Sequence, residues 1–347
     1  MLFTEFVGGA VAINTLQVNS RASKRIWTGD EYLRAGNEEM SLSVSENKAG
    51  VSIAAVRSSW NGLPEVWYCN KNKWTQITHL NQDIPKPEVR AQNIMWTNEN
   101  QQVQGWLLYP QHYDSTKQYP MLVCVHGGPA WISTPTWYAP DFNTTVYTQL
   151  GYFIFFPNPR GSHGQGEQFT QANRRDWGFG DLRDIISGMD TVVAHHSIDT
   201  NRVGILGWSY GGSMAMFSIT QTNKFKAAVA GAGAGDWLSY YGQNRIDKWM
   251  GSYFGASPYD DPEAYRKVSA MTYIKNAKTP TLILVGERDG EAPAPQSFQF
   301  WHALIELGVP TQLVVYAGEG HSFEKEEDRI DVSVRTIEWF DKWMPAE

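Results

Sequence analysis

The sequence is poor in cysteine, in clustered positive charge and in long apolar runs. Its two cysteines are Cys69 and Cys124, and the second lies inside an apolar stretch, so a disulfide framework is not expected. The 29 basic and 36 acidic residues give a formal charge of −7 without any run of lysine and arginine, which argues against a nucleic-acid surface. No stretch of about eighteen apolar residues occurs, which argues against a membrane span.

The N-terminus also lacks the pattern of a secretory signal. Residues 1–13 contain Glu5 among apolar residues and no basic region ahead of them. We therefore expect a soluble, cytoplasmic protein. With 347 residues, 42% of them hydrophobic, and 15 tryptophans, the chain can form one large or two medium domains.

Residues 1–83 are predicted to be all-β. Short alternating segments at 40–45, 50–57 and 65–69 are separated by residues typical of turns. Four strands in about 45 residues make one blade of a propeller, and one blade with part of another cannot close the ring. We expect this remnant to pack on the rest of the chain or on a second copy, and its open strand edges favour a homo-oligomer.

Residues 84–347 show strands alternating with helices after a proline-containing linker at 83–88. Most predicted strands are continuous apolar runs, which is typical of parallel strands buried on both faces, so we expect a doubly wound, mostly parallel α/β domain. The predicted strands are residues 104–109, 121–125, 152–156, 203–206, 227–230, 281–285 and 312–316, and the predicted helices are 181–195, 213–220, 295–307 and 329–343. Ligands of such sheets bind beyond the carboxyl ends of the strands.

The most informative stretch is residues 203–212, an apolar strand that ends in Gly-Trp-Ser-Tyr-Gly. It predicts a nucleophile elbow, in which the chain turns sharply from strand to helix and presents Ser209. Gly207 and Gly211 lie two residues before and after this serine, where small residues let strand and helix pass closely. The N-terminus of the following helix would direct free N–H groups at charge developing beside Ser209.

An activated serine needs a base and a carboxylate that orients the base. Asp289 and His321 each follow a predicted strand, and they occur after Ser209 in the order that the α/β-hydrolase arrangement uses. We expect these three residues to form a catalytic triad. His126 is a rival base and Asp236 a rival carboxylate, although His126 precedes the serine and is expected to be structural.

The backbone N–H groups of Gly128 and Tyr210 are the expected oxyanion hole, because Gly128 follows the strand 121–125 and Tyr210 follows the serine. Trp237, Tyr240 and Tyr241 are either core residues or walls of a substrate pocket, and their position just after the strand 227–230 favours the pocket. No metal or cofactor is expected, because the glycine-rich stretches lack phosphate-loop spacing and His195 and His196 lack partners at metal-ligand spacing.

Several ordered motifs between residues 90 and 345 resemble the prolyl oligopeptidase family, particularly its acylaminoacyl-peptidase branch. These motifs are His-Gly-Gly-Pro at 126–129, Asn-Pro-Arg-Gly-Ser at 158–162, Asp-Trp-Gly at 176–178, Gly-Trp-Ser-Tyr-Gly-Gly at 207–212, Asp-Trp at 236–237 and Gly-Glu-Gly-His at 318–321. The resemblance implies the same triad, oxyanion hole and aromatic pocket.

Two features depart from that family. Its members carry a complete N-terminal propeller, and many have Arg-Val where this chain has Glu291 and Ala292. The resemblance therefore implies a serine hydrolase with an open site. A carboxylic ester hydrolase acting on small acyl esters is expected first, because amide cleavage depends more on binding surfaces that an incomplete propeller would lack. The alternative is an acylaminoacyl-peptidase or oligopeptidase that cleaves acylated or short peptides.

Overall fold

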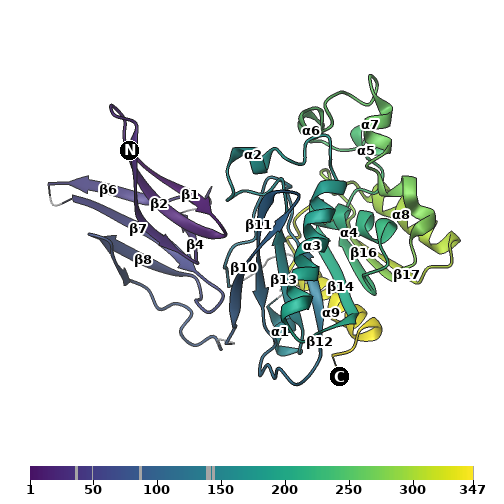
Figure 1. The fold of residues 1–347 in the computed structure, drawn as a ribbon, viewed down its shortest axis with the longest axis horizontal. Helices are drawn as coiled ribbons and strands as arrows, with labels where there is room; N and C mark the ends of the chain where they lie inside the picture. The colour runs from purple at the N-terminus through teal and green to yellow at the C-terminus, as the bar shows by residue number, and fades with distance from the viewer. Residues whose placement is uncertain (36–37, 49, 86–87, 138–141, 143–144, 347) are drawn as a thin grey trace.

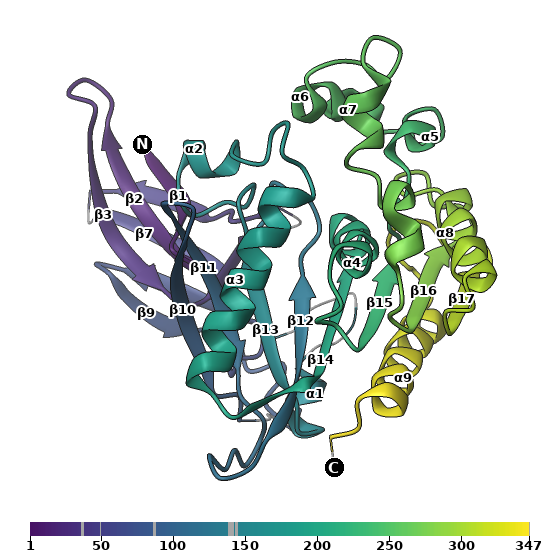
Figure 2. The same ribbon diagram turned by 45° about the vertical axis from the view of Figure 1, so that its right-hand side comes forward.

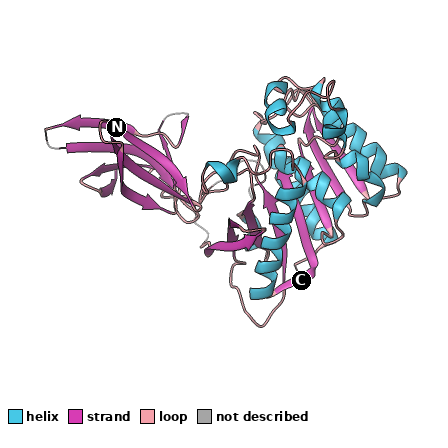
Figure 3. Ribbon diagram, turned by 45° about the horizontal axis from the view of Figure 1, so that its top comes forward, coloured by secondary structure: helices cyan, strands magenta, loops and turns pink. Residues whose placement is uncertain are grey.

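The computed structural model describes residues 1–35, 38–48, 50–85, 88–137, 142 and 145–346. Within these residues two small antiparallel sheets are followed by one large sheet covered by helices (Figure 1). The small sheets end at Gln76 and the large sheet begins at Ala91. Figure 3 shows the all-strand part beside the helix-covered part.

The N-terminal strands pair through tight hairpins. Their bounds are β1 (Leu2–Val7), β2 (Ala10–Gln17), β3 (Ala22–Gly29), β4 (Tyr32–Ala35), β5 (Glu38–Glu39), β6 (Ser43–Asn47), β7 (Gly50–Ser58), β8 (Glu65–Asn70) and β9 (Lys73–Gln76). Gly8 and Gly9 join β1 to β2 with φ of 55° and 88°, and Lys71 and Asn72 join β8 to β9 with φ of 50° and 62°. Two consecutive residues of positive φ give the turn whose twist matches antiparallel strands.

This β-rich segment packs on the large sheet. Its own core is small and contains Val11, Ile13, Leu33, Ile53 and Cys69. The Gly8 N–H donates to the Gly164 carbonyl oxygen over 2.9 Å, and the Gly8 carbonyl accepts from the Asn93 side chain at 2.9 Å. The Trp60 ring stacks on Phe156 with 5.4 Å between ring centroids. The segment thus packs against the rest of the chain at these points, which is one of the two alternatives given in the sequence analysis. The homo-oligomer stays a prediction.

The large sheet is parallel except at one side. Its strands are β10 (Ala91–Asn98), β11 (Gln101–Leu108), β12 (Tyr119–Val125), β13 (Phe153–Asn158), β14 (Ile198–Trp208), β15 (Ala227–Gly231), β16 (Thr281–Gly286) and β17 (Thr311–Tyr316). They lie in the order β10-β11-β13-β12-β14-β15-β16-β17, with antiparallel pairs up to β13 and parallel pairs from there on. This is the α/β-hydrolase fold that the sequence predicted. Each of the seven predicted strands is confirmed in place, and β10 is an additional strand.

Helices cover both faces of this sheet. They are α1 (Val146–Gln149), α2 (Glu167–Thr170), α3 (Phe179–His195), α4 (Tyr210–Gln221), α5 (Trp237–Tyr241), α6 (Met250–Phe254), α7 (Pro262–Arg266), α8 (Ala294–Glu306) and α9 (Glu326–Trp343), with short 3₁₀ turns at Asp247–Trp249 and Ala270–Asn276. Side chains of α3, α4 and α8 share one buried cluster, and those of α1 and α9 share the cluster of the opposite face. Figure 2 shows α3 and α4 lying in front of the central strands.

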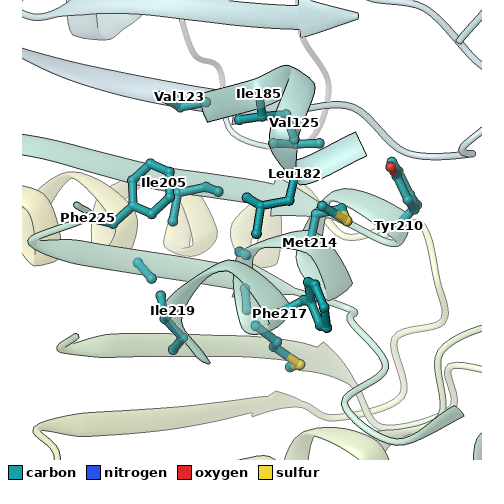
Figure 4. Close-up of a cluster of buried hydrophobic side chains, with 14 of the residues drawn as sticks. Val123, Val125, Leu182, Ile185, Ile205, Tyr210, Met214, Phe217, Ile219 and Phe225 are labelled. Carbon is teal, nitrogen blue, oxygen red and sulfur yellow. The ribbon is translucent and has the colours of Figure 1, made fainter. Parts of the chain in front are cut away.

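The central strands are apolar on both sides. On β12, Val123 and Val125 belong to the cluster under α3 and α4, whereas Leu122 and Cys124 belong to the cluster under α9. Figure 4 shows Val123 and Val125 beside side chains of α3. Because successive residues of a strand point to opposite faces, burial of both sets produces the continuous apolar runs seen in the sequence.

The parallel strands bring five loops to one edge of the sheet. Because parallel strands end on the same side, the residues that follow β12, β14, β15, β16 and β17 meet there. These loops carry Gly128, Ser209, Asp236, Asp289 and His321, respectively. Among the described residues, none of the helices is both long and apolar enough to cross a membrane.

Removal of the Trp60 side chain should loosen the β-rich segment from the sheet. Trp60 is 5% exposed and packs against Trp106 and Phe156, so Trp60→Ala should lower the free energy of unfolding by about 3–5 kcal/mol. Urea unfolding followed by circular dichroism measures this loss. Leu80→Ala is the control, because Leu80 is 81% exposed. A Trp60 variant as stable as the control would contradict this account of the packing.

Candidate functional site

Ser209 occupies a strained turn between β14 and α4. Its φ of 60° and ψ of −119° lie outside the regions that residues with a side chain ordinarily adopt. Two backbone hydrogen bonds hold the turn: the Ser209 N–H donates to the Gly231 carbonyl, and the Ser213 N–H donates to the Ser209 carbonyl, both over 2.9 Å. This geometry is the strand-to-helix elbow that the sequence predicted.

Glycine at 207 and 211 permits the close approach that the elbow needs. A Cβ atom on Gly211 would lie 2.0 Å from the Val125 carbonyl oxygen of the neighbouring strand. A Cβ atom on Gly207 would lie 2.4 Å from the Gly211 carbonyl carbon. Both contacts are far below the normal separation of such atoms, so a side chain at either position would displace α4 from the sheet.

Asp289 and His321 meet beyond the ends of β16 and β17. Asp289 Oδ1 accepts hydrogen bonds from the backbone N–H groups of Glu291 and Ala292, each over 2.8 Å. This pairing directs Oδ2 at His321, whose Nδ1 lies 2.8 Å away. Because a carboxylate only accepts, Nδ1 must donate, which leaves Nε2 of the neutral ring as an acceptor.

Backbone contacts tie the loops of these residues together. The Arg288 N–H donates to the Glu319 carbonyl, and the Gly318 N–H donates to the Glu287 side chain, both over 2.8 Å. Trp208, the residue before the elbow serine, donates from its indole Nε1 to the His321 carbonyl over 3.0 Å. The three predicted triad residues therefore lie on connected loops along one edge of the sheet.

A cavity of about 340 Å³ opens at Ser209. Its lining includes Gly128 and Tyr210, the predicted oxyanion residues, together with Trp237 and Tyr240. Trp177, Trp249 and Tyr253 also line it, and they complete an aromatic wall. The Gly128 backbone has a φ of 114°, a conformation that favours glycine.

Tyr241 does not reach this cavity. Its ring packs edge-on against Tyr259 and Tyr265, with centroid separations of 5.8 Å and 6.0 Å. Successive helical residues are about 100° apart around the axis, so Tyr240 and Tyr241 face different surroundings. The expectation that Tyr241 contributes to the pocket is therefore corrected to packing against the segment 259–265.

The two rival residues have other partners. His126 Nδ1 lies 2.6 Å from the Gly127 carbonyl and its Nε2 lies 2.8 Å from the Ser162 hydroxyl, and burial lowers its pKa to about 4. Asp236 caps α5 by accepting from the Leu238 N–H over 3.2 Å. These contacts give both residues structural roles.

Comparison with known proteins identifies the family of the chain. Residues 137–347 match the model of the prolyl oligopeptidase family, Peptidase_S9. The chain belongs to the prolyl oligopeptidase family. This membership confirms the resemblance that the sequence motifs indicated.

Relatives with similar sequences carry the names of peptidases. It is 34% identical over 253 residues to the uncharacterized peptidase YuxL of Bacillus subtilis, a match covering 72% of this chain and 38% of that protein. It is 27% identical over 306 residues to dipeptidyl-peptidase 5 of Porphyromonas endodontalis, covering 85% of this chain and 44% of the relative. The chain therefore spans less than half the length of these relatives.

Solved structures of other proteins share the fold of the chain. An acylaminoacyl peptidase of Pyrococcus horikoshii has a TM-score of 0.87 at 24% identity, and the match covers 100% of this chain and 54% of that one. A puromycin hydrolase has a TM-score of 0.80 at 20% identity, covering 99% and 53% of the two chains. These likenesses extend over the β-rich segment as well as the large sheet.

The Asp181 carboxyl, which is buried beneath the elbow, lies outside the motifs that were quoted from the sequence. Asp181 of α3 is fully buried, and its Oδ2 accepts a hydrogen bond from the Tyr210 hydroxyl over 2.5 Å. Among the described residues, its Oδ1 has no hydrogen-bond partner. Burial is the main cause that raises the pKa of Asp181 to about 7.

Replacement of Asp181 should flatten the pH dependence of stability. An acid whose folded pKa is raised keeps its proton where the unfolded chain has lost it, so stability is lost as the pH rises from about 4 to about 7. The wild-type unfolding temperature should fall more steeply than that of Asp181→Asn between pH 5 and pH 8. Thermal unfolding across this range is the measurement.

The matched control is Asp190→Asn, which removes a half-exposed carboxylate from the same helix. This control should keep the wild-type slope. Equal slopes for wild type and Asp181→Asn would show that Asp181 is ionised throughout the folded state.

Proposed function

We propose that the chain is a serine peptidase that cleaves short peptides through an acyl-enzyme on Ser209. The observation that carries this proposal is the hydrogen bond between Asp289 Oδ2 and His321 Nδ1, on loops connected to the serine elbow. This hydrogen bond fixes the tautomer of His321, the candidate base, at the edge of the sheet where Ser209 lines a cavity. Asp289, His321 and Ser209 would form the triad.

In this mechanism His321 Nε2 takes the Ser209 proton while the serine oxygen bonds to the scissile carbonyl carbon. The N–H groups of Gly128 and Tyr210 would stabilise the oxyanion that forms. Collapse breaks the carbon–nitrogen bond, and His321 gives its proton to the departing amine. Water then attacks the acyl-enzyme by the same route and releases the acid.

The relatives favour peptide substrates over the small esters that the sequence analysis expected first. The names of the two sequence relatives are those of peptidases, and ester hydrolysis is not confirmed by these comparisons. Amide cleavage requires protonation of the leaving amine, and a histidine held by a buried carboxylate is suited to supply that proton. The aromatic cavity would accept an apolar side chain of a peptide.

Ser209→Ala should abolish covalent labelling by a fluorophosphonate probe and lower kcat/KM for peptide anilides by roughly 10⁴-fold or more. The reason is that alanine cannot form the acyl-enzyme. Labelling followed by mass spectrometry of the modified peptide tests the position. Ser115→Ala, which changes an exposed loop serine, should label normally. Unchanged labelling of Ser209→Ala would refute the assignment.

A matched pair of substrates tests the bond that is cleaved. N-acetyl-phenylalanine p-nitrophenyl ester and the corresponding p-nitroanilide share one acyl group, so deacylation is common to both. We expect the enzyme to turn over both substrates, with kcat limited by that common step if acylation is fast. Hydrolysis confined to the ester would instead favour the carboxylic ester hydrolase.

A further inference from the structure

Glu291 places a negative charge beside the proposed reacting groups. Its carboxylate Oε2 lies 3.7 Å from His321 Nε2, the nitrogen assigned to proton transfer with Ser209. Glu291 also lines the cavity at Ser209. Its backbone is fixed, because the Glu291 N–H donates to Asp289 Oδ1 over 2.8 Å. The carboxylate is thus held at the site by the same turn that orients Asp289.

Of the lining residues that the structure describes, Glu291 is the charged one, and the others are aromatic, aliphatic, serine and glycine residues. Among the described residues, its carboxylate forms no ion pair with lysine or arginine within 4.0 Å. Arg245 lies nearby: its backbone N–H donates to the Gly290 carbonyl over 2.8 Å, and its side chain passes beside Gly290 without an ion pair to Glu291. The Glu291 side chain is 51% exposed, so its charge is accessible to a bound substrate.

We propose that Glu291 selects substrates whose acyl part carries a positively charged amino group near the scissile carbonyl. An ammonium group at this place would pair with the carboxylate while the aromatic walls hold the adjoining side chain. An acylated amine lacks the charge and would place a neutral amide there. The inference rests on the proposed role of Ser209 and adds the substrate class to it.

Covalent geometry favours an α-amino group as the source of this charge. The amine nitrogen of an aminoacyl group lies only about 2.5 Å from its carbonyl carbon, because two bonds of about 1.5 Å separate them. The carbonyl must approach Ser209, whose proton goes to the His321 nitrogen that Glu291 faces. A lysine side chain places its ammonium several bonds further away, so it is the second possible source.

The test measures kcat/KM on three pairs of p-nitroanilides that differ by one positive charge. The pairs are phenylalanine with and without an N-acetyl cap, glycyl-phenylalanine with and without that cap, and N-acetyl-lysine against N-acetyl-methionine. The wild type should favour the charged member of at least one pair. Glu291→Gln, which keeps the shape and loses the charge, should reduce that preference about five- to tenfold, mainly through KM.

Glu306→Gln is the matched control, because Glu306 is an exposed residue of α8 away from the cavity. It should leave every ratio unchanged. The pair that responds to Glu291→Gln identifies the source of the charge. A free α-amino group has a pKa of about 8 and loses its charge between about pH 7 and pH 9.5. If this group is the source of the charge, the wild-type ratio of kcat/KM for the free and the capped substrate should fall over that range. The same ratio for Glu291→Gln should stay constant.

Fluorophosphonate labelling of Ser209 separates the two proposals. If Glu291→Gln labels normally and keeps every ratio within about twofold of wild type, the role of Glu291 is overturned while the peptidase assignment stands. A wild-type enzyme that does not label at Ser209 would overturn the proposed function itself, and the inference on Glu291 with it.

Discussion

The close backbone contact between α4 and β12 is the constraint on which the site depends. Gly211 lies against the Val125 carbonyl, at a separation that no side chain would permit. This approach lets the chain reverse from strand to helix within one residue, and Ser209 takes the strained φ and ψ of that reversal. The turn sits at the carboxyl end of β14, so the neighbouring parallel strands deliver their own loops to the same edge.

Two buried carboxyl groups near this edge have opposite surroundings. Asp289 accepts hydrogen bonds from two backbone N–H groups and lies beside the His321 ring. Asp181, under the elbow, is fully buried and accepts one hydrogen bond from the Tyr210 hydroxyl, and among the described residues its second oxygen has no hydrogen-bond partner. A charge is favoured where donors are present and disfavoured where they are few. The first carboxyl orients the His321 ring, whereas the second holds the Tyr210 hydroxyl.

The strands, and the loops that carry the three candidate triad residues, could be predicted because their signals are local. Buried parallel strands appear in the sequence as continuous apolar runs, and Ser209, Asp289 and His321 each follow such a run. The strand β10 was not predicted, because only Ile94 and Trp96 of its residues are buried and its other positions, apart from the half-buried Ala91, are polar or exposed. Its one-sided burial leaves no continuous apolar pattern.

Only some of the residues that line the pocket could be predicted, because the others come from segments without a sequence signal. Trp249 and Tyr253 come from a short helical region after α5, which has no strand or motif to mark it. The separation of Tyr240 from Tyr241 depends on where α5 begins, a boundary that the sequence leaves open. The approach of Glu291 to His321 likewise depends on the tight turn at Asp289, which is a property of tertiary structure.

The hairpin turn at Gly8 has a consequence for the loop that carries Gly128. The Gly8 N–H donates to the Gly164 carbonyl, and the ring of Phe6, two residues earlier, stacks on the ring of His163. Ser162, one residue further, holds the His126 ring that begins the loop of Gly128. A continuous series of contacts thus runs from the first β-hairpin to the proposed oxyanion loop. The β-rich segment is in this sense an indirect support of the loop that carries Gly128.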